Sequence, residues 1–155
     1  MQILEGVKDP EVPVLSVVEL GVVRNVAFEK EQVVIQITPT YSGCPALKVM
    51  QDEIVSALKE NGFPDVRVDI VYAPAWTTDW IGDAAREKLR RYGIAPPQAN
   101  AADEIVNISS GSRPVPCPMC NSLDTQVQSQ FGSTACKALH LCRSCKQPFE
   151  HFKVF

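Results

Sequence analysis

Alternation of apolar and polar residues predicts three strands in the N-terminal half of this chain. Val22–Phe28 and Gln32–Ile37 are rich in β-branched residues and flank the charged turn Glu29-Lys30-Glu31. This arrangement predicts an antiparallel hairpin, although the turn lacks Gly and Asn. Val66–Val71 alternates apolar and charged residues, which predicts a third strand with one face in water. Together the three segments predict a small antiparallel or mixed sheet.

Two other segments show the spacing of amphipathic helices. Apolar residues recur three and four positions apart between residues 47 and 58, and Gly62 is expected to end this helix. Cys44-Pro45 is expected to begin it, because proline suits the first helical position. A second helix is expected over roughly Ile81–Tyr92, ending at Gly93. Helices kept apart in sequence from the small sheet predict an α+β fold.

Composition changes after the second predicted helix. Ala95–Pro116 is rich in Pro, Ala, Asn, Ser and Gly, which is typical of a linker, and Asp103–Ile108 is expected to form a short strand or turn within it. At 155 residues the chain has room for one ordinary domain and a small module. We therefore expect an α+β domain at 1–95, a linker at 96–114 and a C-terminal module at 115–155.

The C-terminal module contains the strongest chemical signal in the sequence, two C-x-x-C pairs. Cys117 and Cys120 form the first pair, and Cys142 and Cys145 form the second. The stretch between the pairs is long enough for a hairpin that closes a tetrahedral site. A module of about 40 residues cannot bury enough surface to fold unaided, so a bound metal would supply folding free energy. The spacing favours a structural Zn²⁺ site, while a four-thiolate iron–sulfur cluster and a redox dithiol stay open as alternatives.

Other side chains of this predicted zinc ribbon are given supporting roles. Cys136 and His140 lie just before the second pair and are candidate additional ligands, although Cys136 is more simply explained as a small buried apolar residue. Six apolar residues are expected to form a thin core layer on the ribbon strands: Val127, Phe131, Leu139, Leu141, Phe149 and Phe152.

Composition predicts a cytoplasmic protein. No apolar stretch approaches the roughly 20 residues of a membrane span, and the acidic N-terminus matches neither a signal nor a transit peptide. In a reducing compartment, C-x-x-C pairs are more often metal ligands or redox groups than disulfides. We therefore expect no membrane partner, and we interpret the C-x-x-C pairs as metal ligands or redox groups.

Charge is spread unevenly along the chain. Sixteen acidic and ten basic residues precede Arg113, whereas two acidic and five basic residues follow from Arg113 onward. A basic tail of this kind is compatible with nucleic-acid binding. Four thiolates on one divalent ion would bring the tail close to neutrality, so we expect no nucleic-acid partner.

Cys44 is a candidate reactive thiol. It precedes the first predicted helix, where the macrodipole and unpaired N–H groups favour an anion, so its thiol is expected to ionise more readily than a free one. Transient iron or cluster handling is one interpretation of Cys44, and a packed thiol without chemistry is the other. Both histidines, His140 and His151, belong to the C-terminal module, so a cysteine–histidine hydrolase would lack its base.

Two further features are given structural interpretations. Asp9 and Glu11 flank Pro10 and are more simply explained as a solvated acidic turn. Trp76 and Trp80 lie four positions apart and are expected to pack the second helix onto the sheet. The chain contains no glycine-rich nucleotide-binding motif.

Motifs in both halves of the chain match known families. Asp9-Pro10-Glu11, Glu19–Val23, Thr38–Pro45, Pro74–Thr77 and Ala85–Leu89 resemble the iron–sulfur assembly domain family, which includes SufT and the cytosolic iron–sulfur targeting factors. The resemblance runs to about residue 95. With the C-terminal segments Cys117–Cys120, Phe131–Leu139 and Pro148-Phe149, nearly the whole chain resembles the PaaD (PaaJ) family of bacterial phenylacetate degradation.

The resemblance implies an accessory maturation subunit and not an enzyme. It implies partners in the monooxygenase that epoxidises phenylacetyl-CoA, either the di-iron oxygenase or the [2Fe–2S] reductase. It also implies that Cys44 handles iron or a cluster transiently. One protein thiolate cannot hold a cluster alone, so a second protomer, Cys136 or a client ligand would complete the site, and a homodimer is expected. A non-catalytic interaction module and a thiol–disulfide reductase stay open as alternatives.

Overall fold

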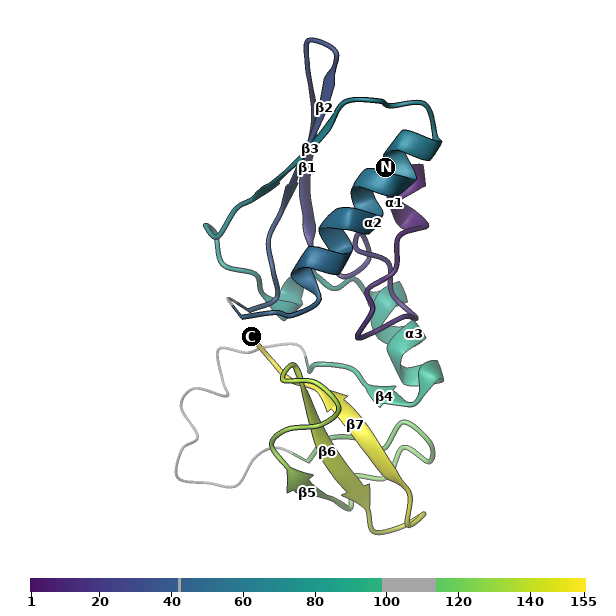
Figure 1. Cartoon of the computed structure of the whole chain (residues 1–155). Helices are drawn as coiled ribbons and strands as arrows, with labels where there is room; N and C mark the ends of the chain where they lie inside the picture. The colour runs from purple at the N-terminus through teal and green to yellow at the C-terminus, as the bar shows by residue number, and fades with distance from the viewer. Residues whose placement is uncertain (42, 99–113) are drawn as a thin grey trace. The chain divides into compact units, whose positions relative to one another are not determined.

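The computed structural model describes residues 1–41, 43–98 and 114–155, and it divides into two units, Met1–Ala85 and Arg86–Phe155 (Figure 1). The strand or turn expected at Asp103–Ile108 lies outside the described residues. None of the helices in the described part of the chain is long and apolar enough to cross a membrane. The predicted boundaries at residues 95 and 115 stay a prediction.

The first unit is built on a three-stranded mixed sheet. β1 (Val23–Glu29) pairs antiparallel with β2 (Gln32–Ile37), and β2 pairs in parallel with β3 (Val66–Ile70). The predicted hairpin and third strand are confirmed. β3 can run parallel to β2 because a helix lies between them in sequence and returns the chain to the starting edge of the sheet. β2 is the central strand, and its residues Val33, Ile35 and Ile37 are buried.

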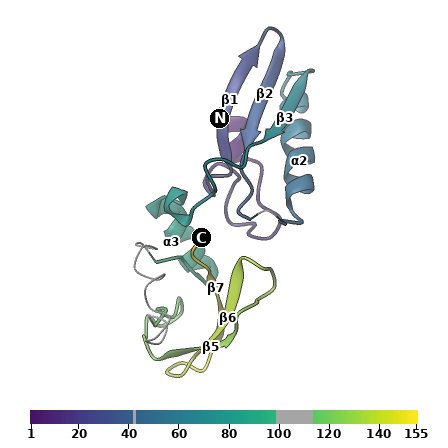
Figure 2. The ribbon, with the colours of Figure 1, turned by 90° about the vertical axis from the view of Figure 1, so that its left-hand side faces the viewer.

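The helix between β2 and β3 is α2 (Leu47–Glu60), which lies along one face of the sheet (Figures 1 and 2). Its predicted end is confirmed: the N–H of Gly62 bonds the carbonyl of Lys59, and the N–H of Phe63 bonds that of Leu58. This pair of bonds, with a positive φ of 90° at Gly62, satisfies the last carbonyls of the helix. Its apolar face is buried through Met50, Ile54 and Leu58.

The predicted start of α2 is wrong by a few residues. Cys44 and Pro45 precede the helix, and Ala46 is the N-cap residue. The N–H of Cys44 bonds the carbonyl of Tyr41, and the N–H of Leu47 bonds the carbonyl of Cys44, so a separate turn leads into the helix. Periodicity does not distinguish such a turn from a first helical turn.

The second predicted helix is present but is shorter than expected. A 3₁₀ turn, η1 (Thr78–Trp80), comes first, and α3 (Asp83–Tyr92) follows and ends before Gly93, whose φ is 94°. The expected packing role of the tryptophans fits Trp76, which is 4% exposed and donates its indole N–H to the carbonyl of Leu20 at 3.0 Å. Trp80 is half-buried and lies under the guanidinium of Arg24.

Gly21 is expected to be sensitive to substitution. Its φ is 74°, and a Cβ there would lie 2.8 Å from Cβ of Trp80. Gly21→Ala should therefore cost about 2–4 kcal/mol, from left-handed strain plus the steric clash. Urea unfolding followed by tryptophan fluorescence measures this cost, because Trp76 and Trp80 both lie in the first unit.

Gly62→Ala is the matched control for Gly21→Ala. Its φ is 90° and nothing lies within 4 Å of the added methyl group, so only the backbone strain of about 1 kcal/mol applies. Equal losses in the two variants would contradict the close approach of Gly21 to Trp80.

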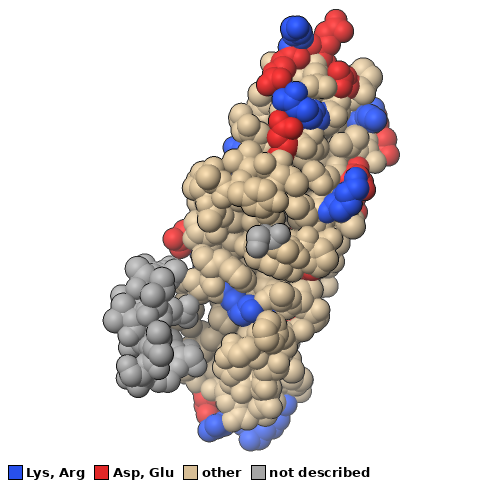
Figure 3. Space-filling view, turned by 60° about the vertical axis from the view of Figure 1, so that its left-hand side comes forward, with Lys and Arg blue, Asp and Glu red and all other residues tan. Residues whose placement is uncertain are grey.

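Charged side chains of both signs gather at the end of the first unit that carries the β1–β2 turn (Figure 3). Arg67 on β3 forms ion pairs with Glu29 at 3.2 Å and with Asp69 at 3.1 Å. These groups are exposed, so each pair contributes little to stability. The mixed signs leave this end of the sheet without a strong field of either sign.

The second unit contains a four-stranded sheet in the order β4-β7-β6-β5. β5 (Thr125–Ser129), β6 (Lys137–Cys142) and β7 (Pro148–Phe152) form an antiparallel ribbon. The short β4 (Ile94–Ala95) pairs in parallel with β7. Residues at the end of the predicted first domain thus take part in the sheet of the second unit.

The expected apolar layer of the ribbon is only partly correct. Phe149 and Phe152 are buried, and Leu139 and Leu141 are half-buried. Phe131 is 68% exposed because it follows the edge strand β5 and lies beyond the sheet, and Val127 on that strand is also exposed. The buried cluster instead includes two of the paired cysteines: Ala95, Val115, Cys117, Cys142 and Phe149.

Candidate functional site

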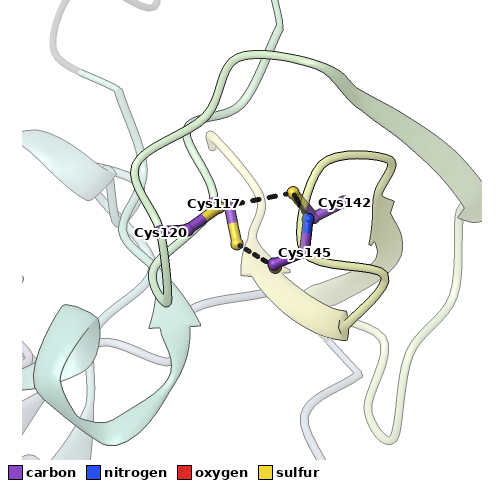
Figure 4. Close-up of side chains that lie close together, drawn as sticks. All are labelled: Cys117, Cys120, Cys142 and Cys145. Atoms are coloured by element: carbon purple, nitrogen blue, oxygen red, sulfur yellow. Dashed lines mark hydrogen bonds between the residues drawn. The ribbon is translucent and has the colours of Figure 1, made fainter.

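Four cysteine sulfurs meet in the ribbon. Cys117 and Cys120 lie on the loop before β5, Cys142 is the last residue of β6, and Cys145 lies on the turn into β7 (Figure 4). All four Sγ atoms lie within 4.8 Å of one another. The Sγ of Cys117 is 3.7 Å from that of Cys145, and the Sγ of Cys120 is 3.6 Å from that of Cys142. The structure therefore brings both predicted pairs to one point.

Each of the two pairs is followed by a residue in the left-handed conformation. The residue after each second cysteine, Asn121 or Lys146, has a left-handed φ of 61° or 62°. In the first pair the N–H of Asn121 bonds the carbonyl of Cys117 at 2.8 Å, and in the second the N–H of Cys145 points to the Sγ of Cys142 at 3.5 Å. Each pair is a tight turn that holds two sulfurs on one side.

The spacing of the four sulfurs fits a single tetrahedral ion. Zinc–sulfur bonds of about 2.3 Å in a tetrahedron place neighbouring sulfurs about 3.8 Å apart, close to the distances between Cys117 and Cys145 and between Cys120 and Cys142. The donor set consists of four cysteine thiols, of which Cys117 and Cys142 are buried and Cys120 is exposed, and four thiolates suit zinc and iron.

The pKa values of the thiols also favour a bound cation. Hydrogen bonding from the backbone N–H of Cys145 lowers the pKa of Cys142 to about 6. The N–H of Ser122 lowers the pKa of Cys120, but burial and the neighbouring thiols together raise it to about 12. The four groups therefore cannot all ionise near neutral pH on their own, and a divalent cation would remove this conflict.

Cys44 lies in the first unit and is half-buried. Burial raises the pKa of its thiol, and the negative charges of Glu11 and Asp9 raise it further. The backbone N–H groups of Ala46 and Leu47 lower the pKa, as expected next to a helix, but they do not outweigh the other causes. The prediction that Cys44 ionises more readily than a free cysteine is therefore wrong.

Asp9 and Glu11 are the residues that the sequence interpretation missed. Asp9 is only 4% exposed, so it does not belong to a solvated turn. Its Oδ1 accepts the N–H groups of Glu11 and Val12, each at 2.8 Å. Both carboxylates lie near enough to act on the charge of Cys44. The Asp-Pro-Glu motif is part of the family resemblance, so the sequence did contain a signal for these two residues. Local sequence alone does not predict that they lie near Cys44.

Comparisons with known proteins match the two parts of the chain to two different families. Residues 1–70 match the model of an iron–sulfur cluster assembly protein family, and residues 101–153 match the PaaD zinc beta ribbon domain. A putative 1,2-phenylacetyl-CoA epoxidase subunit of Escherichia coli K12 is 48% identical over 151 residues, which are 97% of this chain and 88% of that protein. The chain belongs to the PaaD family.

Two other relatives match only part of this PaaD-family chain. The Fe–S protein maturation auxiliary factor YitW of Bacillus subtilis is 36% identical over 94 residues, which are 59% of this chain and 83% of that protein. The crystal structure of a DUF59 domain from Bacillus anthracis aligns with a TM-score of 0.52 at 32% identity and covers 57% of this chain and 85% of that one. More than half of the chain therefore shares the fold of that DUF59 domain.

The other two candidate ligands of the PaaD ribbon lie outside the four-cysteine group. Cys136 is buried, and its Sγ lies 3.0 Å from Oγ1 of Thr134. His140 is buried, stacks on Phe149 and meets the ring of His151 edge-on at 5.3 Å between centroids. In the described part of the chain, Nδ1 of His140 and Nε2 of His151 have no hydrogen-bond partner.

His151 makes the stability of the ribbon sensitive to acid. Burial and the neighbouring His140 lower its pKa to about 4, from an ordinary value near 6.5. Because the folded pKa is depressed, folding is favoured above pH 6.5 and is opposed as the pH falls toward 4. At pH 5 the loss attributable to His151 is about 2 kcal/mol.

His151→Phe should remove this part of the acid sensitivity. Denaturant unfolding of both proteins at pH 7.5 and pH 5 measures it, with bound metal determined in each sample to exclude differences in metal loss. A wild type and variant that lose equal stability over this range would contradict a buried neutral His151.

Proposed function

We propose that this PaaD-family protein is a non-catalytic maturation factor for the phenylacetyl-CoA epoxidase complex. Its role would be to help insert iron or an iron–sulfur cluster into a client subunit. The observation that carries the proposal is the combination found on one chain: similarity to an epoxidase subunit over 97% of the chain, and a match of residues 1–70 to iron–sulfur assembly proteins.

The surroundings of Cys44 support a role in holding iron briefly. The charges of Asp9 and Glu11 disfavour a bare thiolate and, for the same reason, favour a cation beside it. An arriving iron ion would displace the thiol proton and find one sulfur ligand with carboxylates nearby. A thiol that is largely protonated when no iron is bound holds iron weakly. The iron can therefore be released, as transfer to a client requires.

Cys44 cannot hold a cluster without other ligands. The remaining ligands would come from the client subunit or from a second protomer, so the proposal includes a homodimer as one arrangement. The loop that carries Cys44 also contains Thr38, whose buried hydroxyl has no hydrogen-bond partner among the described residues. This hydroxyl is a further polar group in the loop that leads to Cys44.

For the ribbon we propose zinc held by Cys117, Cys120, Cys142 and Cys145. The close sulfur spacing supports a single ion, because the thiolates of a cluster bind different irons and spread further apart. Cys136 and His140 then stay outside the ligand set. The zinc would hold the ribbon folded, and the ribbon would dock the protein on the oxygenase or reductase subunit.

Metal analysis of protein purified without oxygen tests the assignment at the ribbon. A colourless protein with one zinc per chain is the expected result. Visible thiolate-to-iron absorption bands that account for the four cysteines would contradict it and would indicate a cluster at this position.

Production of the epoxidase subunits with and without this chain tests the function. If the chain is a maturation factor, the complex made without it assembles but epoxidises phenylacetyl-CoA at close to the background rate. A complex that fails to assemble without the chain would instead favour the interaction module. Full activity in its absence would contradict both functions.

A further inference from the structure

A groove of about 550 Å³ lies between α1 (Gln2–Glu5) and α2 in the first unit. The wall supplied by α2 consists of residues three and four positions apart, from Val49 to Glu60. This face of α2 is not its buried one, which contains Met50, Ile54 and Leu58. α2 therefore packs on the sheet with one face and offers a second face to the groove.

Four residues of the groove lining have apolar side chains. Ile3 and Val7 contribute from the α1 side, and Val49 and Ala57 contribute from α2. Val49 is 44% exposed, so its side chain is accessible to a partner. The α2 segment from Val49 to Glu60 spans about 17 Å, which is the length of three helical turns.

The groove lining also contains three carboxylates. Asp52, Glu53 and Glu60 line the groove, and no lysine or arginine does. Asp52 pairs with Lys48 at 2.6 Å, but Glu53 and Glu60 form no ion pair with any residue in the described ranges. A second copy docked face to face here would place these carboxylates against their own equivalents, which is unfavourable.

We propose that this groove docks a helix of a partner protein, one whose apolar stripe is flanked by lysine or arginine. A groove lined by both apolar residues and carboxylates suits helix-in-groove recognition, where apolar anchors supply affinity and charges select the partner. The inference goes beyond the proposed function, since it needs neither Cys44 nor the metal of the ribbon.

A synthetic peptide tests the proposal against the full-length, zinc-loaded chain. The probe is a helix of about 14 residues, or four turns, with leucine and alanine on one face and lysine on both flanks. A control peptide has the same composition in scrambled order, without an apolar stripe. In the NMR spectrum of the isotope-labelled chain, the probe should shift the amide signals of Val49, Ser56 and Ala57, and the scrambled peptide should bind weakly.

Charge reversal provides the second test. Glu53→Lys with Glu60→Lys should weaken binding of the probe about tenfold or more. Glu31→Lys, a single charge reversal in the exposed β1–β2 turn, should leave it unchanged, and thermal unfolding checks that each variant is folded. Equal binding by the double variant, equal binding of the scrambled peptide, or shifts confined to other surfaces would overturn the proposal. Self-association of the wild type that the double variant abolishes would assign the groove to a second copy and would also overturn it.

Discussion

Replacement of Cys142 by serine is expected to unfold the ribbon and to leave the first unit folded. Cys142 has no exposed surface and belongs both to the sulfur group and to the buried cluster with Cys117 and Phe149. Structural zinc in small modules supplies a binding free energy of about 10–16 kcal/mol, and the module folds only with it. The thin apolar layer of this ribbon, with Phe131 exposed, cannot replace that contribution.

NMR spectra of the wild type and Cys142→Ser show which unit is lost. Signals of β5, β6 and β7 should collapse to the random-coil region, while those of β1, β2 and β3 keep their positions. Ser144→Ala is the matched control, because Ser144 lies between Cys142 and Cys145 and its side-chain hydroxyl bonds that of Ser122 at 2.7 Å, while its backbone is kept in the variant. A Cys142→Ser protein that keeps one zinc and a folded ribbon would contradict the four-cysteine assignment.

Cys136→Ser completes this experiment. Cys136 is buried but lies outside the sulfur group, so the variant should retain its zinc at a modest cost in stability. Loss of the zinc from Cys136→Ser would show that the ligand set differs from the proposed one.

Replacement of Cys44 by serine is expected to abolish maturation and to preserve folding and binding to the client. Cys44 is half-buried and lies in a turn before α2, so the smaller hydroxyl should be tolerated there. Serine does not ionise near neutral pH and supplies no sulfur ligand, so iron would lose its one thiolate at this site. The epoxidation rate of the complex matured by the variant should therefore fall to the level seen without the chain.

Co-purification with the oxygenase and reductase subunits distinguishes a lost transfer step from lost binding. Cys136→Ser serves as the matched cysteine control in the activity assay. Unchanged epoxidation with Cys44→Ser would remove the role assigned to this thiol and would leave the packed-thiol interpretation.

A change at the carboxylates beside Cys44 tests the proposed role of this thiol independently. Glu11→Gln removes a charge that raises the pKa of Cys44, so the thiol should be alkylated faster at a given pH. If the carboxylates also attract iron, the same variant should mature the client less well. Faster alkylation with improved maturation would contradict the proposed use of the negative charge.

Local patterns in the sequence predicted the parts of the fold that depend on local contacts. The hairpin, the end of α2 at Gly62 and both C-x-x-C turns follow from residues close together in the chain. Features that depend on distant contacts were not predictable in this way. Phe131 is exposed because β5 is an edge strand, and Ile94 and Ala95 pair with β7 across a long stretch of sequence.

Cys44 shows the same limit at the level of chemistry. Its position before a helix correctly predicted that backbone N–H groups lower its pKa. Burial is the largest effect and raises the pKa, and the charges of Glu11 and Asp9 add to this from a segment far upstream that only the folded chain brings near. A sequence motif can mark such a residue as part of a site, but the sign of its pKa shift requires the structure.

The iron content of the client subunits tests the maturation role most directly. The oxygenase and reductase subunits would be purified from cells that make the complex with or without this chain, and iron would be measured in each of them. We predict that one of them is assembled but depleted of iron without the chain, and that wild-type protein restores it whereas Cys44→Ser does not. Full iron content in both subunits without the chain would contradict a role in maturation.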